Sequence, residues 1–312
     1  MSHPDMDVLL DARSPARPDQ TVEQSRAAWT AYSQRLARPA PDDMTIFDYR
    51  VPTPTGDVAV RVYHPATGSA PRPGILYMHG GGFSKGDLDS SDSNAWGFAA
   101  QTSASVVSVD YRLAPEHPYP AAFNDCYGVL TWLAAEGHAL AIDGSRLAVV
   151  GDSAGGNLAA ALCLAARDQE GPRISAQALI YAGVGLDQDT GSYVEHADGP
   201  GLTTAATKNY RAMYLPGDQE THDPYARPVM AGDFAGLPPA LVHSAEIDPI
   251  RDDGRAYAAN LALAGTSVAY REAKGMIHGF MRARFTGAAA ALEYQVICEF
   301  LRDHLFGPAK AG

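Results

Sequence analysis

Short apolar runs alternate with helical stretches along most of this 312-residue chain, and this alternation restricts the fold more than any other feature. Four-residue runs at 75–78, 106–109, 147–150 and 178–181 are apolar at nearly every position, and helical patterns lie between them. Strands that are apolar on both faces belong to a parallel sheet covered by helices on each side. We therefore predict an α/β fold with about eight strands, six of them in a parallel series.

The other predicted elements are bounded by turn residues. Residues 45–51 and 57–63 alternate apolar and polar side chains around a short turn, which is typical of an antiparallel hairpin. Two later apolar runs, 240–244 and 267–272, complete the sheet. The apolar spacing predicts helices over 6–11, 22–36, 94–102, 121–135, 154–168, 251–264 and 288–305.

One long segment, 183–228, interrupts the alternation. It has a weak strand signal, several turn residues and a short apolar and aromatic helix around Tyr210. A connection of this length inside a compact domain is usually a lid or a binding insertion. We predict a single catalytic unit made of N-terminal cap helices (1–44), a catalytic domain (45–182 and 229–312) and a cap insertion (183–228).

Charge and hydropathy exclude several classes of partner. A formal net charge of −12 repels nucleic acid and anionic membrane surfaces. No segment approaches the roughly 18 uninterrupted apolar residues of a membrane span, and residues 1–18 lack the apolar core of a secretory signal. The three cysteines are far apart in apolar surroundings, which suits buried thiols in a reducing compartment. We expect a cytoplasmic protein that binds neither nucleic acid nor membrane.

The strongest local motif is Gly-Asp-Ser-Ala-Gly at 151–155, between an apolar strand and an alanine-rich helix. In this context the Gly-x-Ser-x-Gly pattern is a sharp turn that holds the serine exposed above the sheet. The free amides and dipole of the helix N-terminus favour negative charge nearby. We therefore predict that Ser153 is a nucleophile; the alternative is a glycine-rich turn with an idle serine.

A glycine run follows the strand at 75–78, in His79-Gly80-Gly81-Gly82-Phe83. Glycines leave backbone amides bare and let a ligand approach closely. We predict that the amides of Gly81 and Gly82, with that of Ala154, form an oxyanion hole. A phosphate-binding loop is the competing interpretation, but the spacing of glycine and lysine does not fit one.

A serine nucleophile needs a histidine to take its proton and a carboxylate to orient that histidine. On an α/β-hydrolase sheet these groups follow in the order serine, acid, histidine. Asp248 follows the strand at 240–244, and His278 follows the last strand. We predict these two residues as acid and base.

Several neighbours compete for these two roles. His117, on the loop after the strand at 106–109, is the remaining rival for the base. Glu246, Asp252 and Asp253 are the rivals for the acid, with Asp252 also placed to cap the next helix. Sequence alone does not fix the loop register that separates them.

Together these motifs resemble the microbial hormone-sensitive-lipase-like family of α/β-hydrolase esterases, from about residue 73 to residue 280. The residues that carry the resemblance are the glycine run 79–82, the proline-rich stretch 110–122, Gly-Asp-Ser-Ala-Gly-Gly at 151–156, Asp248-Pro249, and Ile-His-Gly-Phe at 277–280. The resemblance implies an α/β-hydrolase fold and the same catalytic and oxyanion-hole residues.

The activity implied by the resemblance is hydrolysis of short- to medium-chain carboxylic esters through an acyl-serine, with neither metal nor cofactor. Amide, lactone or carbonate substrates remain open, as does a non-catalytic small-molecule receptor of the same family. Relatives often dimerise through the last strand and its helix, so a homodimer is possible. The predicted pocket, whose members can equally be ordinary packing, consists of Phe83, Tyr193, Leu202, Tyr210, Met213, Tyr214 and Leu215.

Overall fold

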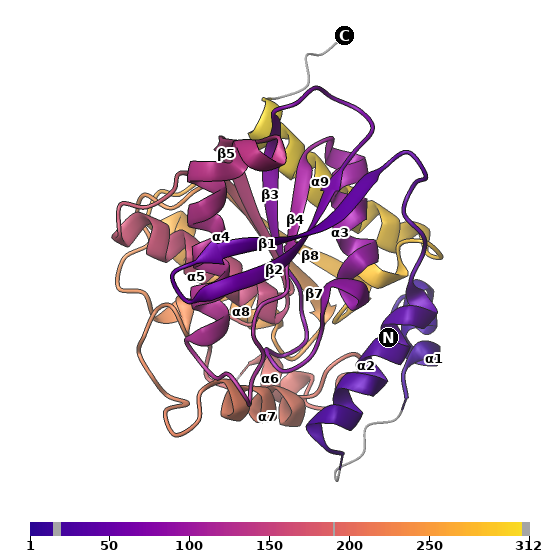
Figure 1. Ribbon diagram of the computed structural model, residues 1–312. Helices are drawn as coiled ribbons and strands as arrows, with labels where there is room; N and C mark the ends of the chain where they lie inside the picture. Colours follow the sequence, from indigo (N-terminus) through magenta and orange to yellow (C-terminus); the bar gives the residue numbers. More distant parts are fainter. Residues whose placement is uncertain (15–19, 190, 308–312) are drawn as a thin grey trace.

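The computed structural model describes residues 1–14, 20–189 and 191–307 and contains one eight-stranded sheet (Figure 1). The first two strands form an antiparallel hairpin, β2 pairs antiparallel with β4, and the remaining ladders are parallel. The strand order is β1-β2-β4-β3-β5-β6-β7-β8, which confirms the predicted α/β sheet. The strands are β1 (Thr45–Thr53), β2 (Gly56–His64), β3 (Arg72–Met78), β4 (Ser105–Val109), β5 (Ile142–Asp152), β6 (Ile174–Ile180), β7 (Ala240–Ile247) and β8 (Val268–Ile277).

The helices agree with the predicted positions, with two exceptions. Helix α3 begins six positions before the predicted start, because Asp87 and Ser90 form a reciprocal capping box at its N-terminus. The short helix α6 lies in the segment where only α7 was predicted. The helices are α1 (Asp7–Ala12), α2 (Val22–Leu36), α3 (Leu88–Thr102), α4 (Ala121–Glu136), α5 (Ala154–Asp168), α6 (Ser192–Glu195), α7 (Thr204–Tyr214), α8 (Arg251–Leu263) and α9 (Ala288–Phe306).

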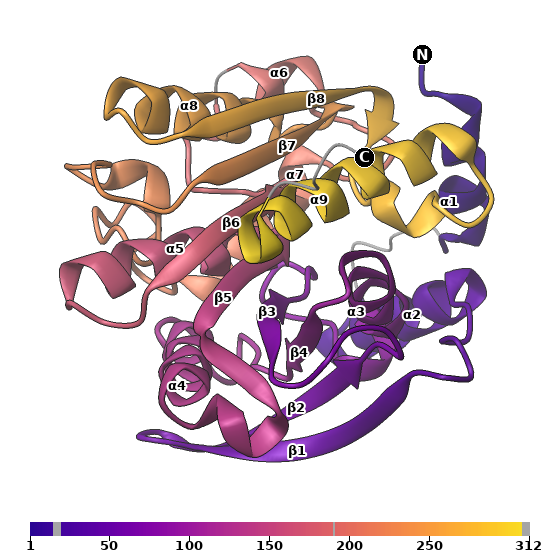
Figure 2. The ribbon, with the colours of Figure 1, turned by 90° about the horizontal axis from the view of Figure 1, so that it is seen from above.

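Helices cover both faces of the sheet (Figure 2). Helices α4, α5 and α8 lie on one face, where their apolar side chains form a core with alternate residues of the strands. Helices α3 and α9 lie on the other face and form a second core with the N-terminal helices. Alternate strand residues thus face two different cores, which is why the central strands are apolar at nearly every position.

A partly buried cluster of charged and polar side chains joins α9 to the last two strands. Glu293 on α9 bonds His243 Nε2 on β7 at 2.8 Å, and its other oxygen accepts from Arg271 Nη2 on β8 at 2.8 Å. Burial alone would raise the pKa of the Glu293 carboxyl, but these hydrogen bonds outweigh it and hold that pKa at about 2. The hydrogen bonds of Glu293 to His243 and Arg271 therefore stabilise the fold while Glu293 is ionised.

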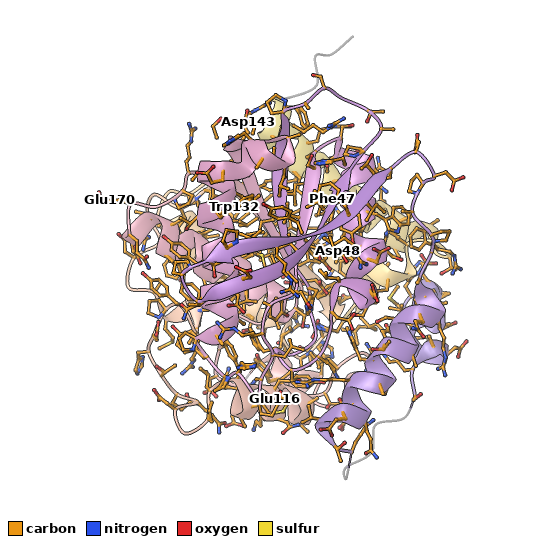
Figure 3. All side chains as sticks on the ribbon, viewed as in Figure 1. Phe47, Asp48, Glu116, Trp132, Asp143 and Glu170 are labelled. Carbon is orange, nitrogen blue, oxygen red and sulfur yellow. The ribbon has the colours of Figure 1, made fainter. Side chains whose placement is uncertain are left out.

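The N-terminal segment packs against one end of the sheet. Met6 and Leu9 are fully buried in the core that includes α9. Arg26 on α2 forms an ion pair at 2.7 Å with Glu116, which lies at the end of the molecule where α7 is drawn (Figure 3). Figure 1 shows α1, α2, α6 and α7 at this same end.

Strand register brings the ends of four strands to one place. Met78 at the end of β3 pairs with Gly151 on β5, and Ile247 at the end of β7 pairs with Ile277 at the end of β8. The glycine run, Ser153, Asp248 and His278 each follow one of these paired residues. Carboxyl ends of parallel strands form one edge, so the predicted catalytic groups meet there.

No helix in the described part of the chain is long and apolar enough to cross a membrane.

Candidate active site

Ser153 occupies a strained turn between β5 and α5. Its φ is 57° and its ψ is −117°, a conformation that side-chain-bearing residues rarely adopt. The flanking glycines make this turn possible: a Cβ on Gly151 would lie 2.0 Å from the Gly155 oxygen, and a Cβ on Gly155 would lie 1.9 Å from the Met78 oxygen. The pattern Gly-x-Ser-x-Gly is therefore required by backbone contact at both glycines.

Ser153, His278 and Asp248 form a continuous line of hydrogen bonds. Ser153 Oγ lies 2.9 Å from His278 Nε2, and His278 Nδ1 lies 2.7 Å from Asp248 Oδ2. With the imidazole proton on Nδ1, the ring donates to the carboxylate and accepts from the serine hydroxyl. Geometry of this kind lets a hydroxyl lose its proton as it attacks a carbonyl carbon.

The surroundings of Asp248 and His278 fix both side chains. Asp248 is fully buried, and its second oxygen accepts a hydrogen bond of 3.1 Å from the Ile250 amide. The Tyr181 ring packs against the imidazole, with 4.8 Å between ring centroids. A Cβ on Gly201 would lie 2.9 Å from the His278 carbonyl oxygen, so the cap segment also presses against this loop.

The structure separates the rival candidates from this line of hydrogen bonds. His117 is exposed and does not line the cavity described below. Glu246 accepts from the Gly275 amide at 2.7 Å and from Lys274. Asp252 accepts from the Ser192 amide at 2.9 Å and bonds Arg251. None of these bonds involves His278.

Asp252 does not cap α8, contrary to the sequence-based expectation. The N-cap position of that helix is Ile250, so Asp252 lies inside its first turn. From this position its carboxylate accepts a hydrogen bond from the Ser192 amide in the cap segment. The residue therefore ties α8 to the start of α6.

Asp253, the third rival, is a buried carboxyl that supports the cap segment. It is fully buried, and its Oδ1 accepts from the amides of Gly185 at 2.9 Å and Leu186 at 3.2 Å. Removal from water raises the pKa of this carboxyl to about 6, although these amides and Tyr193 partly oppose the rise. Asp253 makes no hydrogen bond to His278 among the described residues.

The glycine loop approaches the serine because its residues carry no side chains. Gly81 has a φ of +138°, and a Cβ there would lie 2.0 Å from the Lys85 oxygen. Gly82 has a φ of +61°, and its Cβ would lie 2.4 Å from the Tyr210 ring. Among the described residues, the amides of Gly81, Gly82 and Ala154 have no hydrogen-bond acceptor, and all three residues line the cavity above Ser153.

Two neighbours hold this loop in place. The His79 ring stacks on Tyr111 with 4.3 Å between centroids, and the Tyr111 hydroxyl donates to the His79 carbonyl at 2.6 Å. Asp152 accepts from the Gly80 amide at 3.0 Å and from the Tyr77 hydroxyl at 2.7 Å. These contacts fix the glycine loop against the serine turn, and His79 forms part of that support.

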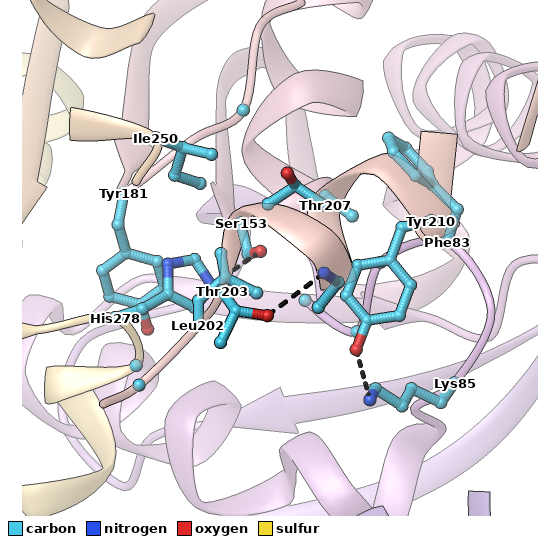
Figure 4. A pocket seen from close by; sticks show the side chains of 18 of the residues that line it. Phe83, Lys85, Ser153, Tyr181, Leu202, Thr203, Thr207, Tyr210, Ile250 and His278 are labelled. Carbon is cyan, nitrogen blue, oxygen red and sulfur yellow. Dashed lines mark hydrogen bonds between the residues drawn. The ribbon is translucent and has the colours of Figure 1, made fainter. Parts of the chain in front are cut away.

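A cavity of about 560 Å³ opens above Ser153 and His278 (Figure 4). Its walls come from the glycine loop, from α7 with the neighbouring cap segment, and from one face of α2. Six of the seven residues predicted for the pocket line it, namely Phe83, Tyr193, Leu202, Tyr210, Tyr214 and Leu215. Phe83 stacks on Tyr214 with 3.7 Å between ring centroids.

The prediction for Met213 is wrong. The cavity-lining positions of α7 include Thr207, Tyr210 and Tyr214, which share one face of the helix. Each residue turns an α-helix by about 100°, so Met213 lies well around the helix from its neighbour Tyr214. Met213 is partly buried and does not line the cavity.

Sequence reasoning placed the N-terminal helices in a cap but did not predict which residues of α2 line the cavity. Ser25, Ala28, Trp29 and Tyr32 line the cavity and share one helical face. The apolar spacing of Trp29 and Tyr32 was the available signal, but it indicated only that this face is buried. Five basic residues of the lining were also missed because no local motif contains them, namely Arg13, Lys85, Arg211, Arg227 and Arg282.

Within the ranges that the structure describes, no group of three or more His, Cys, Asp or Glu side chains is arranged to hold a metal ion.

Comparison with known proteins places this site in a family. The family described as the alpha/beta hydrolase fold matches residues 75–282, which include the glycine loop, Ser153, Asp248 and His278. Esterase LipI of Mycobacterium tuberculosis is 42% identical over 259 residues, which are 80% of this chain and 81% of LipI. Carboxylesterase NlhH of the same organism is 43% identical over 238 residues, 75% of each chain.

A solved structure is similar across nearly the whole chain. A thermostable esterase from Pseudomonas putida superposes with a TM-score of 0.92 at 30% sequence identity, covering 97% of this chain and 98% of that one. The similarity therefore extends beyond the central sheet to the N-terminal and cap segments.

Proposed function

This chain belongs to the hormone-sensitive-lipase-like branch of the α/β-hydrolase family, and from that premise we propose that it hydrolyses carboxylic esters through an acyl intermediate on Ser153. The chain is a carboxylic ester hydrolase, as its esterase and carboxylesterase relatives indicate. The observation that carries the residue assignment is the line of hydrogen bonds from Ser153 through His278 to Asp248, at 2.9 and 2.7 Å.

Acylation begins when Ser153 Oγ attacks the ester carbonyl carbon. His278 Nε2 accepts the hydroxyl proton, and Asp248 stabilises the imidazolium that results. The carbonyl oxygen becomes an oxyanion. When the tetrahedral intermediate collapses, the bond to the leaving oxygen breaks and His278 returns the proton to it, so the first product is a neutral alcohol.

Deacylation uses the same imidazole. A water molecule gives a proton to His278 Nε2 as its oxygen attacks the acyl carbon. Collapse of the second intermediate breaks the bond to Ser153 Oγ, which recovers the proton from His278. The acid product leaves, and the serine hydroxyl is restored.

The oxyanion of both intermediates is stabilised by backbone amides in this proposal. Gly81, Gly82 and Ala154 line the cavity next to Ser153, and their amides lack acceptors among the described residues. Donors that are already oriented need no rearrangement when charge develops, which is why such groups contribute strongly to acyl transfer.

The cavity supports esters of limited length. Its volume of about 560 Å³ is in the range of small-molecule sites, and the aromatic rings of Phe83, Tyr210 and Tyr214 limit it on the cap side. We propose short- to medium-chain esters as substrates, with the N-terminal helices and the segment 183–228 acting as a cap over one catalytic domain.

The substitution Ser153→Ala tests the function. We expect kcat on a chromogenic short-chain ester to fall by about a thousandfold or more, while circular dichroism and thermal unfolding stay as in the wild type. A folded Ser153→Ala protein that keeps its hydrolysis rate would place the nucleophile elsewhere.

Cellular location and assembly are finer proposals. All three cysteines are buried and unpaired, which supports a reducing compartment such as the cytoplasm. Strand β8 is an edge of the sheet with a partly exposed Tyr270, and Leu292 on α9 is also exposed. We propose a homodimer through β8 and α9, which light scattering after gel filtration tests: a monomer mass at assay concentration would contradict it.

A further inference from the structure

The cavity above Ser153 is lined by an excess of basic side chains. Five basic residues line it, and among the described residues the only carboxylate in the lining is that of Asp152. Asp152 accepts from the Gly80 amide and the Tyr77 hydroxyl, and it forms no ion pair with any of the basic residues that the structure describes. The five basic residues are Arg13, Lys85, Arg211, Arg227 and Arg282.

Two of these five share an ion pair with one carboxylate, and the other three have no carboxylate partner among the described residues. Arg211 and Arg227 both lie within ion-pair distance of Glu220, at 3.7 and 3.1 Å. The other three bond only neutral oxygens among the described residues: Arg13 Nη1 donates to the Gly201 carbonyl, Lys85 Nζ to the Tyr210 hydroxyl at 2.7 Å, and Arg282 Nη1 to the Ser90 carbonyl at 2.8 Å.

The three unpaired cations gather around two aromatic rings of α2. Lys85 Nζ lies 5.3 Å from the centre of the Trp29 ring, and the Arg282 guanidinium carbon lies 5.0 Å from that centre. Arg13 lies 5.2 Å from the centre of the Tyr32 ring. Cation–π contacts position these groups, but they leave a net positive charge uncompensated. We call the three cations and the two rings together the cationic wall, which consists of Arg13, Trp29, Tyr32, Lys85 and Arg282.

The same wall carries hydrogen-bonding atoms that have no partner. Tyr32 is 4% exposed, and its hydroxyl has no acceptor among the described residues. Trp29 Nε1 and Arg13 Nε are also buried there, and neither has a hydrogen-bond partner in the part of the chain that the structure describes. Buried donors without acceptors are costly and are usually satisfied, so a cluster of them beside a cavity indicates a missing acceptor.

We propose that the cationic wall binds a carboxylate of the substrate, so that the preferred substrate is an ester that carries a second, ionised carboxyl group. This inference rests on the proposed ester hydrolysis and adds the chemical class of the substrate. A carboxylate supplies acceptor oxygens for the Trp29, Tyr32 and Arg13 donors and negative charge for the three cations. The chain as a whole carries a net charge of −12, so attraction of an anion depends on this local wall.

The carboxylate can belong to either half of the ester. The wall touches both sides of the reaction centre: Arg13 bonds Gly201, which packs against His278, whereas Lys85 extends from the glycine loop (Figure 4). In the proposed mechanism the leaving alcohol lies next to His278, and the oxyanion lies next to the glycine loop. In both cases the substrate carries its anionic group close enough to the scissile carbonyl for both to lie in the same cavity.

Two matched pairs of esters distinguish these halves. For the acyl half, 4-nitrophenyl hydrogen adipate is compared with 4-nitrophenyl methyl adipate by release of 4-nitrophenol. For the alcohol half, 4-carboxyphenyl butyrate is compared with its methyl ester by release of the corresponding phenol. In each pair the measured quantity is the ratio of kcat/KM for the anionic ester to kcat/KM for the neutral ester.

The variants are Lys85→Met and Arg13→Gln, which remove one positive charge from each side of the wall. Lys274→Met is the matched control, because Lys274 is exposed, pairs with Glu246 and Glu272 and does not line the cavity. In at least one ester pair we expect both variants to lower the ratio about tenfold or more, as for loss of a charge-assisted hydrogen bond. The control should keep the wild-type ratio.

The proposal is overturned if neither ester pair shows such a fall, or if Lys274→Met lowers the ratio as much as the wall variants. Should a wall variant fail to fold, the wild-type ratio decides: raising NaCl from about 0.05 to 0.5 M should lower it severalfold, and an unchanged ratio contradicts an anion site.

Failure of the proposed function is distinguishable from failure of this inference. If no ester is hydrolysed, the proposed function fails, and the wall is then tested by calorimetric binding of the two adipate esters to the Ser153→Ala protein. Tighter binding of hydrogen adipate than of methyl adipate supports the wall, and equal or weaker binding overturns it.

Discussion

Replacing Asp248 by asparagine changes charge and proton placement while keeping the shape of the side chain. In the wild type, Oδ1 accepts from the Ile250 amide at 3.1 Å and Oδ2 faces His278 Nδ1 at 2.7 Å. The Ile250 amide can only donate, so in Asp248→Asn the amide oxygen stays on it and the NH₂ group turns toward His278. The imidazole then accepts at Nδ1 and carries its proton on Nε2, facing Ser153 Oγ, where it cannot act as a base.

The magnitude follows from two losses. Flipping the asparagine to restore the active tautomer leaves the buried Ile250 amide without an acceptor, which costs about 1–3 kcal/mol. Loss of the carboxylate charge removes a hydrogen bond to the imidazolium worth about 1.5–3 kcal/mol. Together these raise the barrier by about 2.5–6 kcal/mol, so we expect kcat/KM to fall about 10²–10⁴-fold.

The assay is hydrolysis of a 4-nitrophenyl ester, with thermal unfolding measured in parallel. Asp253→Asn and Glu246→Gln are the matched controls, because both carboxyls are close in sequence and neither bonds His278. We expect each control to stay within about tenfold of wild-type activity. A folded Asp248→Asn protein with activity in the control range would refute the assignment of the acid.

Three further predictions concern stability. Burial raises the pKa of the Asp253 carboxyl from 3.8 to about 6, so the native state binds a proton more tightly than the unfolded state and loses stability as pH rises through this window. In denaturant unfolding, Asp253→Asn should therefore remove a cost of at most about 3 kcal/mol above pH 6 and no cost below about pH 4. An equal effect of the substitution at both pH values would contradict this prediction. Ionisation of Glu293 stabilises the native state instead, since the pKa of this carboxyl is lowered to about 2. The destabilisation by Glu293→Gln should therefore be complete above about pH 4.5 and shrink as pH falls toward 2. A destabilisation that does not change with pH would contradict this prediction. Gly155→Ala would place a Cβ 1.9 Å from the Met78 oxygen, so it should lower the free energy of unfolding by more than about 3 kcal/mol. The control Gly232→Ala, whose Cβ would have nothing within 4 Å, should change that free energy little. Similar melting temperatures for the two variants would show that the serine turn relaxes to accept the Cβ.

The sequence predicts the sheet and the meeting of Ser153, His278 and Asp248 well because both leave local signals. The central strands face two cores and are therefore apolar at nearly every position. Ser153 lies in a turn whose glycines are required by contacts of 2.0 and 1.9 Å, so the motif itself encodes the geometry. Asp248 and His278 directly follow residues that pair across β7 and β8.

The parts that could not be predicted depend on distant packing. Arg13 and Arg282 reach the same cavity from opposite ends of the chain, and no spacing rule links them. The start of α3 was missed because its first turn is polar, and only the reciprocal bonds of Asp87 and Ser90 reveal a capping box. Met213 shares a helix with true cavity residues, but composition does not tell which helical face meets the cavity.

The central claim is that Ser153 becomes covalently bonded during the reaction. The most direct measurement treats the protein with a 4-nitrophenyl alkylphosphonate, which mimics the tetrahedral intermediate, and locates the adduct by peptide mass spectrometry. The account predicts one adduct per chain, on Ser153, formed in step with loss of esterase activity and absent from the Ser153→Ala protein. Loss of activity with the adduct on another residue, or continued ester hydrolysis with Ser153 fully modified, would contradict it.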